Sequence, residues 1–575
     1  MNSSQIKYEG WLYGLAFLIA LAFRFIALGA FPLTDSEAML ALQALGIARG
    51  DSPILAPQPA YILFTAVLFA IMEGTNFLAR LLPALAGSAF VFAPWFFRQR
   101  IHPRPALILA FLFAFDPGLV AMSRQASGTM LAVSFLLFAW AMWNHKRVIA
   151  FGILSGLALL SGASLWGGLL ALGLTRLFLQ GMKPRSHEGQ ETPSPGLRSQ
   201  FTNPQLFASF LATFLFCGTL FFLAPNGLSA ALSSVAAYLS GWVAPTVTPP
   251  GRILFTFLTY ELLGIFLALL AIFRAVRTNG KRAICLMLWM GVTLLLAVFY
   301  RQPGELVWAV IPLLTLSALE LARAFDIRRE ERTEVGIVVA AISILLVYTW
   351  FNVSGVALNP FNQFPTTLPL LGEVQNARLV VLLGSILIVI VCIALVALGW
   401  SARIARLGVT LCFSAFLCVY ALASAWGASG LRNPNGFELW RTDPRVAQAD
   451  LLIASVDDLS EFSLGHDQSQ PVTVAGVLSP ALEWTLRDHT VETVSVLDPQ
   501  IAPPVVVTPV MEDLGLPSAY RGQDFTWRQQ PGWANLQPQD WLKWFVFREL
   551  PMENETIILW ARDDLFPDAR GGAQP

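Results

Sequence analysis

Apolar runs separated by short polar loops dominate the first three quarters of the chain. A helix needs about 20 apolar residues to cross about 30 Å of hydrocarbon, and thirteen runs approach that length. They cover residues 11–31, 77–97, 105–122, 128–143, 148–161, 164–180, 205–224, 252–273, 283–299, 305–322, 335–353, 379–400 and 405–428. The pattern predicts an all-α polytopic membrane domain of about 13 transmembrane helices over residues 1–430.

Composition supports this prediction. Of the 575 residues, 55% are hydrophobic and only 13% are charged, whereas soluble domains carry about 25% charged residues. The five cysteines all lie inside apolar runs without the spacing of a zinc site, so we expect small buried side chains. The sequence contains no Walker loop, nucleotide fingerprint or metal cluster.

Loop charges predict the orientation. Pro59–Met72 is apolar but short for a span, and if it stays in the interface, Arg98–Arg104 and every later basic loop face one side. That side then holds roughly 20 Lys and Arg against roughly 6 on the other, as the positive-inside rule requires. We therefore expect Pro59–Met72 to be a juxtamembrane or re-entrant helix and Lys183–Asn203 to be a polar inside loop without fixed structure. The N-terminus is predicted to be cytoplasmic and the tail extracytoplasmic, in the plasma membrane of a prokaryote.

The first outer loop, residues 32–76, is the longest on its side. Thr34 is a suitable N-cap and Glu37 follows three residues later, which is the capping-box pattern. Alanine, leucine and methionine then recur at helical spacing. A helix over Asp35–Arg49 is therefore expected, so that this loop carries interfacial helices.

The tail, residues 431–575, is acidic, with 21 Asp and Glu against 10 Lys and Arg. Its β-branched runs predict strands and its amphipathic stretches predict helices, so we expect a small α/β domain. The expected strands are 471–477, 494–497 and 556–560, and the expected helices are 446–459, 479–487 and 538–548. Trp541 and Trp544 either rest on the membrane interface or form a small aromatic core.

Acidic side chains are rare on the outer side, so Asp35 and Glu37 are the main candidates for chemistry. Residues two apart do not share a helix face. Asp35 therefore either points into a cavity while Glu37 caps the helix, or the two clamp one cation from a turn. Both acids also suit the positive end of a helix without any catalytic role.

Basic side chains on the outer side could bind an anion. Arg124, Arg252 and Arg301 suit a phosphate, although each also suits an anchor that snorkels to lipid headgroups. Tyr300 and Glu305 flank Arg301 and are further candidates. Asp116 precedes Pro117 inside the third run, where it needs a partner or water, or bonds backbone freed by the proline.

Four stretches together resemble the GT-C membrane glycosyltransferases related to protein O-mannosyltransferases, aminoarabinose transferases and the archaeal-type flippase-associated group. They are the acidic motif Leu33–Leu42, the Arg-Leu-Pro-like Asn76–Gly87, Asp116–Arg124, and Pro480–Asp488 in the tail. The resemblance covers most of the first 180 residues and patches of the tail. Positions 34, 36, 127, 129 and 485 depart from the family pattern.

The resemblance implies thirteen spans, Asp35 as the acid at the reaction centre and Glu37 as its helper. It also places Arg80 and Arg124 near a donor phosphate. The implied activity is inverting transfer of a hexosyl or pentosyl group from a polyprenyl-phosphate donor to an extracytoplasmic protein, lipid or cell-wall glycan. Asp35 would act as general base. The resemblance implies no particular cofactor and is compatible with a divalent cation, and nucleic acid is not an expected partner.

Two other classes of function remain open. A flippase or accessory protein for lipid-linked oligosaccharides would share the fold without needing a catalytic acid. A secondary transporter would show internal repeats, and none is visible in the sequence.

Overall fold

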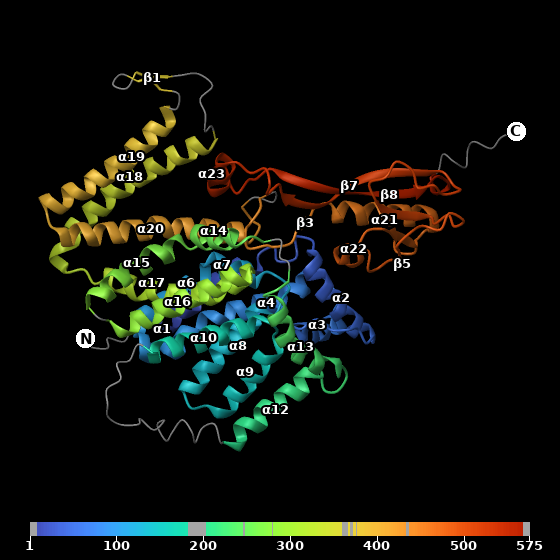
Figure 1. Ribbon diagram of the computed structural model, residues 1–575, viewed down its shortest axis with the longest axis horizontal. Helices are drawn as coiled ribbons and strands as arrows, with labels where there is room; N and C mark the ends of the chain where they lie inside the picture. Colours follow the sequence, from blue (N-terminus) through green and yellow to red (C-terminus); the bar gives the residue numbers. More distant parts are fainter. Residues whose placement is uncertain are drawn as a thin grey trace.

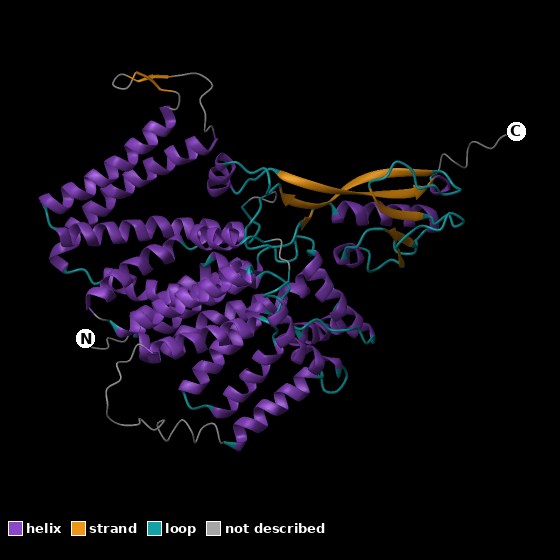
Figure 2. Ribbon diagram, in the orientation of Figure 1, coloured by secondary structure: helices purple, strands orange, loops and turns teal. Residues whose placement is uncertain are grey.

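The computed structural model describes residues 8–181, 203–244, 248–278, 280–358, 366–368, 372–374, 377–432 and 436–566. A large helical body carries a smaller sheet domain at one end, built by the last part of the chain (Figure 2). This arrangement confirms a helical domain followed by a small α/β domain. Most of the predicted polar loop Lys183–Asn203 lies outside the described residues.

Each of the thirteen predicted runs contains a helix. The helices are α1 (Glu9–Phe25), α4 (Asn76–Ala89) continuing through η1 (Phe90–Phe92) into α5 (Ala93–Ile101), α6 (Pro103–Phe115), α7 (Pro117–Ser123), α8 (Thr129–Asn144), α9 (Val148–Leu160), α10 (Ser164–Gly181), α12 (Pro204–Gly218), α14 (Pro250–Tyr260), α15 (Leu262–Thr278), α16 (Lys281–Tyr300), η2 (Pro303–Leu306) with α17 (Val307–Ala324), η3 (Arg329–Glu331) with α18 (Arg332–Leu358), α19 (Ala377–Gly399) and α20 (Ala402–Ala428). Within the described ranges, six helices are long and apolar enough to cross a membrane, or up to nine if each bent pair is one span. The predicted number of 13 spans is therefore not confirmed.

Three helix pairs are bent at short breaks. The angle is 54° between α6 and α7, 119° between α9 and α10, and 83° between α14 and α15. Asp116 occupies the first break, where its Oδ1 accepts a hydrogen bond of 2.8 Å from the N–H of Leu119 and caps α7. This is the local backbone role that the sequence left open for Asp116, because Pro117 cannot continue the preceding helix.

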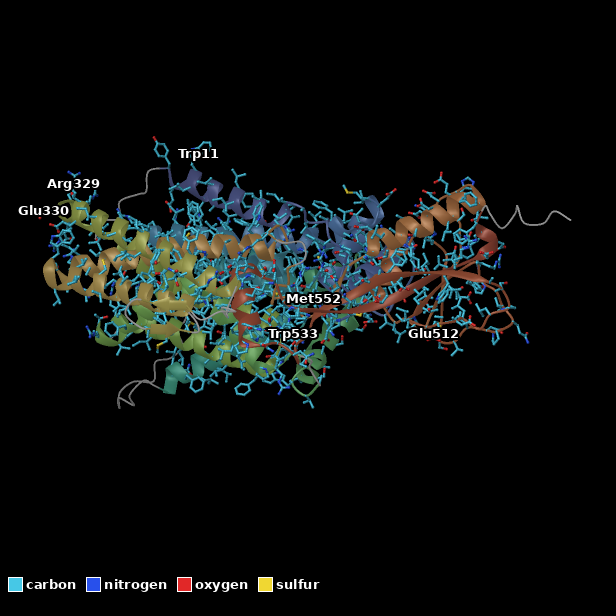
Figure 3. All side chains as sticks on the ribbon, turned by 90° about the horizontal axis from the view of Figure 1, so that it is seen from above. Trp11, Arg329, Glu330, Glu512, Trp533 and Met552 are labelled. Carbon is cyan, nitrogen blue, oxygen red and sulfur yellow. The ribbon has the colours of Figure 1, made fainter. Side chains whose placement is uncertain are left out.

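Basic loops gather at the end of the helical body away from the sheet domain. In Figure 3, Arg329 and Glu330 lie at one extremity, with Glu512 of the sheet domain near the other. Arg282 donates to the carbonyl of Arg100 at 3.1 Å, and the Arg100 guanidinium donates to Asn144 at 2.6 Å. The predicted inside loops that the structure describes near residues 100, 144 and 282 thus share one end, while the side of the membrane on which they lie remains a prediction.

The first outer loop folds as predicted into two packed helices. Helix α2 (Asp35–Arg49) begins with the Thr34–Glu37 capping box and ends at Gly50, whose φ of 92° is in the left-handed region that glycine tolerates. Helix α3 (Pro59–Ile71) packs beside it (Figure 1), and its placement in the membrane interface remains a prediction. A further outer helix, α13 (Asn226–Ser240), contacts α3.

The tail forms a six-stranded sheet in the order β3-β7-β8-β6-β4-β5, in which β4 pairs in parallel with β5 and β6 and the other pairs are antiparallel. The strands are β3 (Arg445–Val446), β4 (Val472–Ala475), β5 (Val491–Val494), β6 (Val505–Pro509), β7 (Tyr520–Pro531) and β8 (Met552–Arg562). The helices of the tail are α21 (Ala449–Leu464), α22 (Pro480–Thr485) and α23 (Pro538–Phe547). Outside the tail, a two-stranded hairpin of β1 (Thr366–Leu368) and β2 (Gly372–Val374) follows α18. The three predicted tail helices and two of the predicted strands, in β4 and β8, are present. The third predicted strand lies three residues earlier, as β5.

Helix α23 attaches the sheet domain to the helical body. Trp544 is fully buried, contacts the rings of Phe255 and Tyr260 of α14 in tilted and edge-on arrangements, and donates from its indole N–H to the carbonyl of Phe437 at 2.8 Å. Trp541 also meets Phe255, with ring centroids 4.8 Å apart. The tryptophans therefore belong to an aromatic cluster at the contact between the two domains, which agrees with the aromatic-core alternative. Figure 3 shows Trp533 and Met552 at the same border.

The segment between α20 and β3 runs across the outer end of the helical body. Trp440 is 1% exposed and lies on Gly118, where an added Cβ would be 2.4 Å from the indole ring. The N–H of Leu439 donates to the Tyr260 hydroxyl at 3.1 Å, and Arg252 donates to the carbonyl of Arg441 at 2.6 Å. This anchored strap, residues 436–446, holds polar side chains against the first turn of α2.

Candidate functional site

A polar cavity of about 30 Å³ lies beside the first turn of α2, with room for about two water molecules. It is built from the start of α2, the end of α7 and the anchored strap. The lining side chains are Thr34, Ser36, Glu37, Ala121, Arg124, Gln125, Ala428, Glu438, Trp440, Arg441, Thr442 and Asp443. Glu37 and Arg124, predicted as site residues, thus meet here with strap residues that the sequence did not single out.

Glu37 is a buried structural acid in this site. Its carboxylate accepts from Arg80 at 2.6 and 2.9 Å and from the N–H groups of Ala126 at 2.9 Å and Thr34 at 3.1 Å. Burial acts to raise the pKa of Glu37, but the charge and hydrogen bonds of Arg80, with the two N–H groups, outweigh it and lower the pKa to about 2. A carboxylate held this firmly as an anion is a poor proton acceptor.

Arg80 and Arg124 donate most of their hydrogen bonds to backbone carbonyl groups of the protein. Besides Glu37, Arg80 donates to the carbonyls of Leu28, Phe31 and Pro32. Arg124 donates to four carbonyls at the end of α1, those of Phe23, Arg24, Ile26 and Ala27, at 2.9 to 3.1 Å. Such carbonyls have no partner within their own helix, so both arginines fix the path from α1 into α2. Their role as phosphate ligands remains a prediction.

Arg441 is the available cation of the cavity. Within the described ranges its guanidinium makes no hydrogen bond, ion pair or ring contact, although it lines the cavity beside Glu438. Burial, followed by the nearby charge of Arg80, lowers the pKa of Arg441, because its positive charge is incompletely compensated. Arg445 lines an adjoining cavity together with Arg441, so an anion entering here meets two arginines from one strap.

Asp35, the main sequence candidate, faces the sheet domain. Its Oδ1 accepts from the Ser479 hydroxyl at 2.5 Å and from the N–H of Ala481 at 3.1 Å. Its Oδ2 accepts from Arg528 Nε at 2.7 Å in an ion pair. Asp35 is not among the residues that line the cavity. It connects α2 to α22 and β7, and its catalytic role remains a prediction.

The carboxylate of Asp443, on the anchored strap, lies at the start of α2. Its Oδ2 accepts from the N–H of Ser36 at 3.1 Å and its Oδ1 from the hydroxyl of Thr442 at 3.2 Å. It lines the cavity and makes no ion pair with any described residue. The positive end of α2 therefore carries three carboxylates: Asp35 and Glu37 of its own first turn, and Asp443 from a distant part of the chain.

The other predicted residues lie outside the cavity. Arg252 holds the backbone of Arg441, and its guanidinium also lies 4.3 Å from the Trp533 ring centre. Arg301 is exposed at the end of α16, with a φ of 62°. Tyr300 stacks on Tyr238 with centroids 4.9 Å apart.

The last two predicted residues, Asp116 and Glu305, are buried. Asp116 is hydrogen-bonded to the carboxyl group of Glu261, so that the breaks in two bent helix pairs meet. Glu305 is buried in η2 and packs closely on Gly167. Across the described part of the chain, no three His, Cys, Asp or Glu side chains are grouped to hold a metal ion.

Acid should weaken the fold through Glu37. An unfolded glutamate has a pKa of about 4.3, against about 2 here, so the ionised side chain stabilises the fold above about pH 4.3. That stabilisation, on the order of 3 kcal/mol, is lost as the pH falls toward about 2. Thermal unfolding of the detergent-solubilised chain between pH 6 and pH 3 measures it. The Glu37→Gln variant should lose less stability over this range, and an equal loss in both proteins would contradict the assignment.

A local signal for the strap exists in the sequence. Glu438-Leu-Trp-Arg-Thr-Asp-Pro-Arg445 follows directly after the last apolar run and concentrates charges around one tryptophan. Such a stretch next to a membrane is typical of an interfacial segment. Nothing in its spacing indicates that it returns to residue 36, because that contact joins residues 407 positions apart.

Comparison with known proteins identifies the architecture. No family model and no curated protein matches the sequence. Among solved structures, ArnT from Cupriavidus metallidurans bound to undecaprenyl phosphate aligns over 88% of this chain and 94% of that chain, with 15% identity and a TM-score of 0.53. The apo state of ArnT aligns over 87% and 93% with a TM-score of 0.49 and 15% identity. The resemblance to aminoarabinose transferases is thus confirmed at the level of the fold, which this chain shares with ArnT over 88% of its length.

Proposed function

We propose that this chain is a membrane glycosyltransferase that takes a sugar from a polyprenyl-phosphate donor and passes it, with inversion, to an extracytoplasmic acceptor. The observation that carries the proposal is Arg441, whose guanidinium makes no hydrogen bond or ion pair with a described residue and lines a polar cavity at the positive end of α2. The solved ArnT structure with this fold is described as bound to undecaprenyl phosphate, which is a lipid of the kind the proposal requires.

The chemistry suits such a cavity. The leaving group is a phosphate, already a weak base, so the reaction needs positive charge and oriented donors rather than a strong acid. Arg441, Arg445 and the first turn of α2 supply that charge. The reaction also needs one carboxylate to take the acceptor proton, and Asp35 and Asp443 both lie at this turn.

The donor's hydrocarbon chain needs an apolar path. An apolar groove of about 770 Å³ lies between the end of α2, helix α3 and the turn after α12. Helix α2 has 15 residues, so the groove begins roughly 20 Å from the cavity at 1.5 Å per residue. A polyprenyl chain following α2 would connect the two, and exposed Phe221 and Leu223 at the groove offer further contact with the bilayer.

The acceptor would enter from the sheet domain. A polar cavity of about 380 Å³ lies between the start of α4 and helices α21 and α22, lined in part by Asn76, Asp450, Arg487 and Asp488. Its mixture of acids and donors suits a hydroxyl-rich acceptor, whether a glycan, a protein or a lipid.

Replacing Arg441 with alanine should weaken binding of undecaprenyl phosphate by about 10- to 100-fold, because a hydrogen bond to a charged group contributes about 1.5–3 kcal/mol. Native mass spectrometry or calorimetry on the full chain in nanodiscs measures the affinity. Arg521→Ala is the matched control, since that arginine pairs only with exposed groups of the sheet domain. Equal affinity of wild type and R441A would remove Arg441 from the site.

Transfer itself is tested in proteoliposomes supplied with envelope extract and a panel of undecaprenyl-phosphate sugars. Consumption of one donor, with release of undecaprenyl phosphate, supports the transferase. Movement of intact lipid across the bilayer without donor consumption would instead favour the flippase alternative.

A further inference from the structure

We propose that the helical body binds an anionic phospholipid at the end where α1 begins, with one acyl chain in an apolar cavity and the lipid phosphate on Arg100 and Arg282. The cavity has a volume of about 150 Å³ and lies among α5, α6, α8, α16 and α17. It shares no lining residue with the polar cavity beside α2 or with the apolar groove beside α3. This inference does not depend on the proposed sugar transfer.

The new site and the polar cavity lie at opposite ends of α1. Arg98, two residues before Arg100, pairs with Glu9 at the first residue of α1, with 3.9 Å between the charged atoms. The polar cavity lies beyond the other end of this helix of 17 residues, which is roughly 25 Å long at 1.5 Å per residue. A lipid headgroup at Arg100 therefore does not reach the polar cavity.

The cavity is open at its basic end and closed at the other. Arg100 is exposed and Trp140 is 36% exposed, whereas Leu109 is buried and Phe113 is only 1% exposed. Phe113 lies ten residues after Pro103, the first residue of α6, so the cavity reaches roughly 15 Å into the body. An apolar cavity of about this volume excludes water and accepts an apolar guest. It is too narrow for a helix, whose diameter is about 10 Å, and suits a single hydrocarbon chain.

Three loops bring hydrogen-bond donors to the open end. Arg282 donates to the carbonyl of Arg100 at 3.1 Å, and Arg100 donates to Asn144 Oδ1 at 2.6 Å. Neither arginine forms an ion pair with an acid of the described residues, and the buried Nδ2 of Asn144 donates to no described group. Two guanidinium groups beside an amide N–H suit a phosphate, and basic pockets between membrane helices bind the headgroups of anionic lipids.

One face of α16 leads from this basic opening into the cavity. Arg282, Leu286 and Trp289 follow one another at i, i+4 and i+7, and the last two line the cavity. Trp289 is 8% exposed, and its buried indole N–H donates to no described group, although a buried tryptophan N–H usually has a partner. Seven residues place it roughly 10 Å beyond Arg282, where the ester carbonyl of a phospholipid follows the phosphate.

The same features separate an anionic phospholipid from other membrane lipids. A zwitterionic phospholipid would bring its own cation to Arg100 and Arg282, which have no acid to receive it. A polyprenyl phosphate carries the phosphate but has no ester carbonyl for the N–H of Trp289. Phosphate and ester together therefore favour the phospholipid.

Native mass spectrometry of the full chain in detergent, titrated with phosphatidylglycerol, phosphatidylethanolamine or undecaprenyl phosphate, tests the headgroup. Wild type should bind phosphatidylglycerol at least about tenfold more tightly than phosphatidylethanolamine. Arg100→Ala should weaken phosphatidylglycerol binding by about 10- to 100-fold and remove this preference. Arg329→Ala is the matched control, because Arg329 is exposed in η3 and lines no part of the cavity, and it should leave the affinity unchanged.

A diether analogue of phosphatidylglycerol, which lacks ester carbonyls, tests the role of Trp289. Wild type should bind the diester about 2- to 12-fold more tightly than the diether, and Trp289→Phe should lower diester affinity by the same factor without changing diether affinity. The melting temperature without added lipid shows whether each variant is folded, and the comparison of diester with diether in wild type needs no variant.

Three results would overturn the inference. They are equal affinity of wild type for phosphatidylglycerol and phosphatidylethanolamine, equal losses in R100A and R329A, and tighter binding of undecaprenyl phosphate that R100A abolishes. The last result would assign the cavity to the polyprenyl lipid. None of these measurements requires transfer activity, so failure of the proposed function would leave them unchanged.

Discussion

Replacing Glu37 with glutamine is expected to destabilise the folded chain by about 3–5 kcal/mol. The change leaves the buried Arg80 without its counter-charge, and breaking one side of a buried ion pair costs that much. Both side chains are less than a tenth exposed, and the N–O distance is 2.6 Å. Because Arg80 also holds three carbonyls between α1 and α2, the entry to α2 should loosen. Heating the detergent-solubilised protein and measuring the monodisperse fraction quantifies the loss.

The control is an ion pair of the same length that is exposed to solvent. Arg521 and Asp563 of the sheet domain are also 2.6 Å apart, but both are about half exposed. Asp563→Asn should therefore change stability by less than about 1 kcal/mol. Similar losses in E37Q and D563N would show that burial does not govern the Glu37–Arg80 pair.

Replacing Arg124 with alanine should also destabilise the chain, by about 3 kcal/mol or more. The substitution leaves the carbonyls of Arg24 and Ile26 without their donor, and one unsatisfied buried group costs about 1–3 kcal/mol. The carbonyls of Phe23 and Ala27 keep a second donor, the Ser429 hydroxyl and the N–H of Ala30. Any loss of donor binding should accompany the loss of fold. The same heating assay, run with and without undecaprenyl phosphate, measures both effects.

Arg301 is the natural comparison for Arg124, since the sequence predicts both as phosphate ligands. It is exposed at the end of α16, so Arg301→Ala should alter stability by no more than about 0.5 kcal/mol. An R124A protein as stable as wild type that no longer binds undecaprenyl phosphate would contradict the structural role and support a direct phosphate contact.

The parts of the fold that follow local rules could be predicted. Apolar runs became helices because the period and length of a run are local properties, and α2 begins at its capping box for the same reason. The number of spans could not be derived, since breaks such as that at Asp116 bend a run without changing its composition. Strand β7 was missed because residues 520–531 are mostly polar and are paired by β3 and β8 rather than by their own pattern.

The candidate site was predicted only in part. That Asp35 and Glu37 point in different directions follows from helix geometry, and Glu37 does cap α2 as one alternative required. The partners of Asp35 are 444 to 493 positions away in the chain, and no local pattern encodes such contacts. Arg441 and Asp443 could not be predicted for the same reason. The anchored strap is held in position by contacts of Trp440, Tyr260 and Arg252 with distant parts of the chain.

Three distant parts of the chain enclose the cavity: residues 34–37, the end of α7, and residues 438–443. A ribosome must complete every predicted membrane helix before the last of these parts exists, so no nascent chain shorter than about 440 residues could form the cavity. A frameshift late in the coding sequence, before codon 438, would then yield a helical body that is inserted in the membrane but lacks the cavity. Conversely, separately expressed fragments divided at one of the predicted inside loops would restore the cavity whenever they assemble.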